Sequence, residues 1–147
     1  MFKEAFSDPE TTRHLQWDIH RSIEETIDLV QEMIEQQRKG EKYFWIAMDQ
    51  RTSRPVGFGS IQPDNQTAWI GIMVFKSEKR KGFGKKLLSA LESSVLNNYD
   101  SSLAMIEKDN VGSLALFESA GWQQQISERN SKSITYKKTR SSPEPSP

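Results

Sequence analysis

The spacing of apolar residues changes along the chain and so separates helical from strand-like segments. A helical spacing of three or four residues comes first; its members are Ile23, Ile27, Val30 and Ile34. Ser22 and Glu25 form a capping box before this segment, and Gly40 ends it. The pattern predicts an amphipathic helix with one buried apolar stripe.

Three strand-like runs follow this helix. Residues 43–48, 56–61 and 67–74 are rich in aromatic and β-branched residues, and the stretches between them, QRTSRP and PDNQ, are rich in turn formers. Three consecutive strands joined by short turns predict an antiparallel meander.

The second half of the chain alternates between the two patterns. One apolar face is predicted for a helix that ends at Asn97 and Asn98; it consists of Leu87, Leu88, Leu91 and Val95. A short strand at 103–106, a helix at 110–120 stopped by Gly121, and strands at 122–126 and 133–138 complete the pattern. Strand 67–74, this helix and strand 103–106 predict a βαβ unit, while SDPETTRHLQW near the start predicts a short helix.

Composition adds limits on function. The 147 residues predict a single domain, 1–140, and a proline- and serine-rich tail, 141–147, that we expect to be disordered. The 20 basic and 20 acidic residues cancel, and cysteine is absent, which excludes disulfides, thiolate metal ligands and a cysteine nucleophile. No long apolar run is present, so we expect a cytoplasmic protein without a membrane partner.

The stretch KRKGFGKKLL, residues 79–88, places two glycines among basic residues at the start of a predicted helix. Helix N-termini offer unpaired N–H groups, and glycine lets a ligand approach the backbone, so the stretch suggests a phosphate site. A Walker loop would need a glycine at Lys79, and a dinucleotide fingerprint would need one at Leu87. A solvated basic helix cap remains the alternative interpretation.

Two motifs in order give the chain a family resemblance. K-x-x-G-x-G at 79–84 follows a strand, and NVGSLALFESAGW at 110–122 follows the next helix and strand. This arrangement resembles the GNAT superfamily of N-acetyltransferases, and N-x-x-S at Asn110 and Ser113 is similar to the branch that acetylates ribosomal-protein N-termini. The resemblance implies an α/β (α+β) fold with a mixed, mostly antiparallel sheet, a splayed central strand pair and flanking helices.

The same resemblance implies acetyl-CoA as co-substrate, an amine acceptor and no metal. The loop that would hold the pyrophosphate comprises Lys79, Arg80, Lys81, Gly82, Phe83, Gly84 and Lys85. The strand whose backbone would polarise the thioester carbonyl contains Ile72, Met73 and Val74. Asn110 would hold the pantetheine or the loop, although asparagine is also a common helix cap. Ser113 would protonate the departing thiolate or hold a water that does so, and a plain surface hydroxyl is the alternative.

The acceptor side is less defined. Histidine is the residue type whose unperturbed pKa lies near neutrality, so either His14 or His20 is a candidate for taking the amine proton, although a structural role is the competing interpretation for both. Glu24, Glu25, Glu107 and Asp109 are further candidates as base or as contacts to a cationic acceptor, or else they are solvated charges. The aromatic residues that would line an acceptor pocket, or else belong to the core, are Trp17, Phe44, Trp45, Phe58 and Trp69.

The chain also departs from the family pattern. Lys79 replaces an arginine or glutamine, Trp69 and Gly71 stand in a strand that often carries an acid, and Phe117 occupies the usual tyrosine position. The family's first strand is not visible, which would leave a sheet edge open to a second chain, so a homodimer is an open alternative to a monomer. These departures make a catalytically weak or inactive CoA-binding module the second hypothesis. A nucleic-acid-binding domain is a distant third, because Phe83 is the single aromatic residue within the basic stretch.

Overall fold

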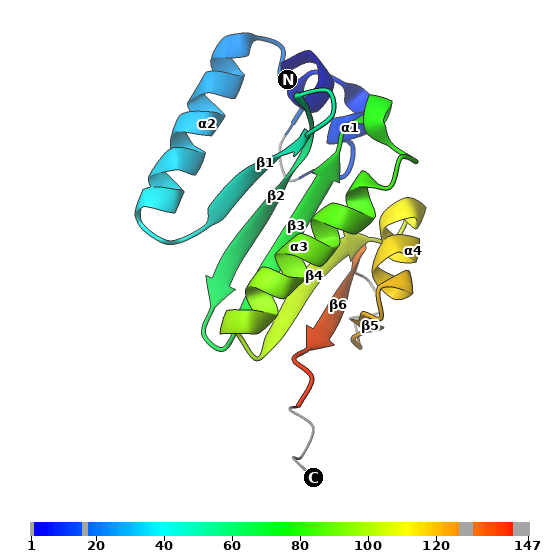
Figure 1. Cartoon of the computed structure of the whole chain (residues 1–147). Coiled ribbons are helices and arrows are strands. Elements are labelled where there is room, and N and C mark those ends of the chain that lie inside the picture. The colour runs from blue at the N-terminus through cyan, green and yellow to red at the C-terminus, as the bar shows by residue number, and fades with distance from the viewer. Residues whose placement is uncertain (1, 16–17, 127–130, 143–147) are drawn as a thin grey trace.

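Six strands form one mixed sheet in the computed structural model, which describes residues 2–15, 18–126 and 131–142. The strand order is β1-β2-β3-β4-β6-β5 (Figure 1). The strands are β1 (Tyr43–Asp49), β2 (Arg54–Asp64), β3 (Thr67–Val74), β4 (Ser101–Glu107), β5 (Gln123–Gln124) and β6 (Ser133–Thr139). The sequence-based prediction of a mixed, mostly antiparallel α/β sheet is confirmed.

Helical segments flank this sheet. They are the π-helical η1 (Phe2–Phe6), α1 (Pro9–Thr12), α2 (Ile23–Arg38), the 3-10 turn η2 (Lys76–Glu78), α3 (Phe83–Asn98) and α4 (Val111–Ser119). Figure 1 shows α3 across the sheet at β3 and β4, α4 near β5, and α2 beyond β1. None of the described helices is long and apolar enough to cross a membrane.

Local sequence signals fix several helix ends. Asp8 Oδ2 accepts a hydrogen bond from the Thr11 N–H at 2.7 Å, and Ser22 Oγ accepts one from the Glu25 N–H at 3.4 Å. These contacts satisfy donors that the first helical turn leaves unpaired. Gly40, two residues after α2, has a φ of 73°, a left-handed conformation that favours glycine.

Strand pairing confirms both predicted supersecondary units. β1 pairs with β2 and β2 with β3, each antiparallel, which gives the predicted meander. β3 and β4 run parallel and are connected through α3, as a βαβ unit requires. β6 lies antiparallel to β4, and the predicted strand at 122–126 is reduced to the two residues of β5.

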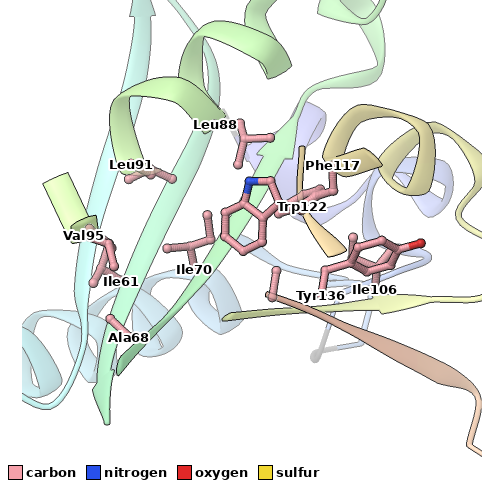
Figure 2. Packing of buried hydrophobic residues seen from close by; sticks show 11 residues of the cluster. Ile61, Ala68, Ile70, Leu88, Leu91, Val95, Ile106, Phe117, Trp122 and Tyr136 are labelled. Atoms are coloured by element: carbon pink, nitrogen blue, oxygen red, sulfur yellow. The ribbon is translucent and has the colours of Figure 1, made fainter. Parts of the chain in front are cut away.

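The main hydrophobic core lies between α3 and the sheet. Leu88, Leu91 and Val95 of α3 pack with sheet residues such as Ile70, and Trp122 closes this core toward α4 (Figure 2). The close approach of α3 to β2 favours a glycine, because a Cβ on Gly59 would lie 2.7 Å from Leu91 Cδ1 and the leucine side chain would have to shift.

The predicted buried stripe of α2 is wrong. Ile23, Ile27 and Ile34 are 53%, 48% and 63% exposed, whereas Thr26 is buried and Leu29 packs against a second apolar cluster around Phe75. The apolar spacing identified a helix correctly, but this helix packs on the protein through the neighbouring face, which contains a threonine.

Candidate active site

The centre of the sheet opens between two parallel strands. β3 and β4 pair at three positions that end with Trp69 and Leu103, yet β3 continues to Val74 and β4 to Glu107. The Phe75 N–H donates to the Val56 carbonyl of β2. Because the N–H groups of successive residues in a strand point to opposite sides, the N–H groups of Ile72 and Val74 point toward β4. The predicted splay is therefore present, and it leaves main-chain groups of Ile72 and Val74 facing the gap.

A cavity of about 480 Å³ lies at this opening. Side chains and backbone from β1 to β4, from α4 and from the segment after α1 line it. The predicted site residues among them are His14, Phe44, Phe58, Trp69, Ile72, Met73, Glu107, Asn110, Ser113 and Phe117. The loop residues 79–85 and Val74 do not line the cavity.

The glycine loop forms a separate surface at the end of β3. Arg80 and Gly82 have φ values of 64° and 83°, which turn the backbone sharply before α3. A Cβ on Gly84 would lie 3.7 Å from Val74 Cγ2 and 3.4 Å from Leu116 Cδ2, so the loop adjoins both β3 and α4.

Donors at this loop remain available to an anion. The Lys86 N–H donates to the Gly82 carbonyl at 3.3 Å, and the N–H groups of Phe83 to Lys85 precede this first helical bond. Lys81 is paired with Glu78 at 3.0 Å, whereas Lys79, Arg80 and Lys85 have no ion pair within the part of the chain that the structure describes. The backbone and three cations thus fit a phosphate group.

Helix α4 positions two of the predicted catalytic side chains. Asn110 is the N-cap, and its Oδ1 accepts a hydrogen bond from the Ser113 N–H at 3.3 Å. This contact fixes the first turn of α4 and leaves the Ser113 hydroxyl beside the cavity without a partner among the described residues. Phe117, one turn further along, is 2% exposed and packs edge-on against Trp122 at 5.0 Å.

An ion-pair network borders the cavity at the end of β4. His14 Nδ1 lies 2.8 Å from Glu107 Oε2 and 3.5 Å from Asp109 Oδ1, and Arg13 Nη2 lies 3.3 Å from Asp109 Oδ2. One imidazole and two carboxylates within 4.8 Å have the composition of a metal site, but the Arg13 guanidinium already neutralises Asp109. The absence of a metal therefore stays a prediction.

Other predicted acceptor residues lie elsewhere. His20 stacks on Phe6 at 5.1 Å and its Nδ1 is 2.7 Å from Thr26 Oγ1, so it has a structural role. Glu24 and Glu25 are exposed on the first turn of α2, and Trp45 is exposed outside the cavity lining. Trp17 lies outside the described residues.

Sequence reasoning missed four polar residues of the cavity, Lys42, Ser60, Gln62 and Ser133. Lys42 Nζ lies 5.4 Å from the centre of the Phe44 ring, and burial lowers the pKa of this lysine. The alternation of side chains along a strand was the available signal, because Lys42 precedes the predicted cavity residue Phe44 by two positions.

Comparisons with known proteins agree with this arrangement. The model of a family described as an acetyltransferase (GNAT) domain matches residues 1–123. No curated protein sequence matches the chain.

Three solved structures illustrate the likeness in fold. Spermidine N-acetyltransferase from Vibrio cholerae, solved with CoA and spermine, has a TM-score of 0.78 and 12% identity, with 95% of this chain and 87% of that chain covered. A ribosomal-protein-serine acetyltransferase assigned in the same organism has a TM-score of 0.75 and 20% identity, with 95% and 90% covered. The N-acetyltransferase PseH from Campylobacter jejuni, solved with acetyl-CoA, has a TM-score of 0.70 and 10% identity, with 82% and 84% covered.

Proposed function

The chain belongs to the GNAT acetyltransferase family, and on that premise we propose that it transfers the acetyl group of acetyl-CoA to a primary amine by direct attack. The acceptor amine belongs to a protein N-terminus, an amino sugar or a small molecule. The observation that best supports this proposal is the splay of β3 from β4. The gap between the two strands opens into the cavity of about 480 Å³, and the glycine loop lies next to it.

The proposed cofactor position follows from the available donors. N–H groups at the start of α3 would bind the pyrophosphate together with Lys79, Arg80 and Lys85, which have no ion pair among the described residues. The pantetheine arm would lie between β3 and β4, where its amides replace the missing ladder hydrogen bonds. Two similar structures contain CoA or acetyl-CoA, and one acts on spermidine by name, which supports this substrate pair.

The proposed chemistry needs no covalent intermediate with the protein. The N–H groups of Ile72 and Val74 face the gap and would stabilise the oxyanion that forms as the amine attacks the thioester. The Ser113 hydroxyl would pass a proton to the departing thiolate, directly or through a water. Phe117 would form an apolar wall beside the thioester, without a proton to give.

Binding and turnover measured together test the proposal. We expect calorimetric binding of acetyl-CoA and release of the CoA thiol in the presence of at least one amine from a panel of polyamines, amino sugars and peptides. Failure of acetyl-CoA to bind the folded protein would refute the proposal at its first step.

Replacement of Ser113 by alanine tests the assigned proton donor. We expect Ser113→Ala to lower kcat roughly 10-fold or more while acetyl-CoA affinity stays unchanged, because the hydroxyl acts on the leaving thiolate. Phe117→Tyr is the matched variant and should leave kcat within a few-fold, or raise it if the new hydroxyl reaches the sulfur. Wild-type kcat in Ser113→Ala would show that this assignment is wrong.

A CoA-binding module without turnover is the second candidate function. The specific observation in its favour is Phe117, which is buried beside the cavity and lacks the hydroxyl of the usual tyrosine. This function predicts tight binding of CoA and no thiol release with any amine, and it predicts turnover in Phe117→Tyr alone.

A further inference from the structure

Resting on the proposed acetyl transfer, we propose that His14 is the general base that takes the proton from the acceptor amine, and that Glu107 positions its ring. The two side chains come from segments 93 residues apart and meet beside the cavity at 2.8 Å. The sequence placed both among several histidine and acidic candidates, and of these candidates only His14 and Glu107 line the cavity.

The contact between the two side chains determines which ring nitrogen is free. An ionised carboxylate accepts hydrogen bonds but cannot donate them, so the bond from His14 Nδ1 to Glu107 Oε2 requires the proton to be on Nδ1. In the neutral ring Nε2 then carries a lone pair. Nε2 has no hydrogen-bond or ion-pair partner among the described residues, so it can accept a proton from a ligand.

Burial and anchoring suit this role. The His14 side chain is 22% exposed, which limits its rotation while leaving a path to solvent for the proton. Thr12, the last residue of α1, is buried, and its carbonyl accepts a hydrogen bond from the Leu15 N–H at 3.0 Å, so the turn that carries His14 is fixed to α1. A catalytic base needs such a fixed position, because proton transfer depends on geometry first.

Glu107 links the ring to the rest of the site. It is the last residue of β4, the strand from which β3 diverges, and it lies three positions before Asn110, the N-cap of α4. The cavity lined by His14 and Glu107 is also lined by Ile72 and Ser113. A bound thioester therefore has the oxyanion donor, the proton donor and the base around one space.

The charged groups around the ring are consistent with the assignment. Asp109 Oδ1 is 3.5 Å from the same Nδ1, but Arg13 holds the other oxygen of that carboxylate at 3.3 Å. Glu107 has no such cationic partner among the described residues apart from His14 itself. It is thus the anion that stabilises an imidazolium after proton transfer.

The protons of the reaction balance with one base and one acid. Nε2 of His14 takes one proton from the acceptor ammonium, which frees the nitrogen lone pair for attack on the thioester carbon. A C–N bond forms, the C–S bond breaks, and the second amine proton reaches the sulfur through Ser113 or water. The imidazolium then returns its proton to solvent, so the products are the amide, the CoA thiol and one proton.

Three variants separate the role of the base from the role of the contact. His14→Asn retains an N–H donor for Glu107 but lacks the basic nitrogen, and we expect kcat to fall roughly 10²-fold with unchanged acetyl-CoA affinity. In His14→Ala, added imidazole should restore part of the lost rate. His20→Gln is the matched control, and its kcat should stay within about threefold of wild type and should not respond to imidazole.

The positioning role of Glu107 has its own readouts. Glu107→Gln offers both a donor and an acceptor to Nδ1, so the ring loses its single tautomer, and kcat should fall roughly 10-fold or more while the KM for acetyl-CoA is unchanged. Nitrogen-15 NMR of the histidine rings in the wild-type protein should show the Nδ1–H tautomer at His14 and a mixture in Glu107→Gln. This measurement needs no turnover.

The outcomes distinguish this inference from the proposed function. Wild-type kcat in His14→Asn, or an Nε2–H tautomer at His14, would overturn the inference while the transferase function stands. Acetyl-CoA binding with no thiol release in wild type would overturn both, even if the tautomer is as expected. Loss of kcat in His14→Asn together with imidazole rescue of His14→Ala would support both.

Discussion

Gly84 lies at the junction of three parts of the proposed cofactor site. The space beside its Cα is bounded by Val74 of β3 and Leu116 of α4, while the space beside Gly82 is open. A methyl group fits at Gly84 in ordinary van der Waals contact, but a branched side chain would extend into the approach to the N–H groups of α3.

We therefore expect Gly84→Val to weaken acetyl-CoA binding at least roughly tenfold, because the branched side chain blocks access to the backbone donors. Isothermal titration calorimetry measures this change. Ala90→Val, at an exposed position of the same helix, controls for the lower helix propensity of valine and should bind like wild type. Equal affinity of the folded Gly84→Val protein would exclude this loop as the phosphate site.

Tyr136 gives a second prediction for a single residue. Burial, followed by the hydrogen bond to Glu118 at 2.7 Å, raises the pKa of Tyr136 to about 12, against about 10 for an unfolded tyrosine. The folded state retains this proton more strongly, so the associated stability is complete below pH 10 and is lost as the pH rises toward 12. Denaturant unfolding between pH 8 and 11.5 should show a steeper loss of stability in wild type than in Tyr136→Phe.

Whole elements were largely predictable because their signals are local. Caps, glycines and the spacing of apolar residues predicted α2, α3 and the strands of the meander. The turn η1 was missed because a segment of five residues is too short to show a helical repeat of apolar residues. The orientation of α2 was not predictable, since apolar spacing defines a stripe but not the surface that covers it. In this chain Thr26 faces the protein and Ile34 faces outward.

Two substitutions on α2 test this orientation. Ile34→Glu should change the free energy of unfolding by no more than about 0.5 kcal/mol, because the side chain is 63% exposed. Leu29→Ala should cost about 1 to 2 kcal/mol, because Leu29 packs against the cluster around Phe75. Urea unfolding of both variants measures the two changes in the free energy of unfolding. A larger loss of stability in Ile34→Glu than in Leu29→Ala would show that the apolar stripe of α2 is buried, as the sequence predicted.

At the scale of the molecule, the sequence predicted the family through two motifs, but not the site that forms between distant segments. Asn110 and Ser113 were predicted because they belong to a motif, whereas the pairing of His14 with Glu107 depends on tertiary structure. Lys42 was missed because a lysine before a strand is ordinarily solvated, although strand alternation places it on the same face as the predicted cavity residue Phe44.

The chain end provides a prediction at the same scale. Arg140 donates from its N–H to the Asp100 carbonyl at 2.8 Å and from Nε to the Tyr99 carbonyl at 3.2 Å, while Ser141 and Ser142 are exposed. Removal of residues 141–147 should leave the melting temperature and acetyl-CoA affinity nearly unchanged. Removal of residues 140–147 should lower the melting temperature by roughly 3 °C, because it deletes these contacts. Calorimetric melting of the two truncated proteins distinguishes the contribution of Arg140 from that of the tail.

The early end of pairing between β3 and β4 also has a consequence for the rate at which the protein exchanges amide hydrogens. A central strand is normally among the most protected segments of a domain, but the Ile72 and Val74 amides face a gap in which no ladder bond shields them. These two amides should exchange quickly in the free protein, whereas neighbouring amides such as that of Met73, which are hydrogen-bonded to β2, should exchange slowly. Bound acetyl-CoA should slow both of them, so a pair of alternating amides would report occupancy of the site before any acceptor is known.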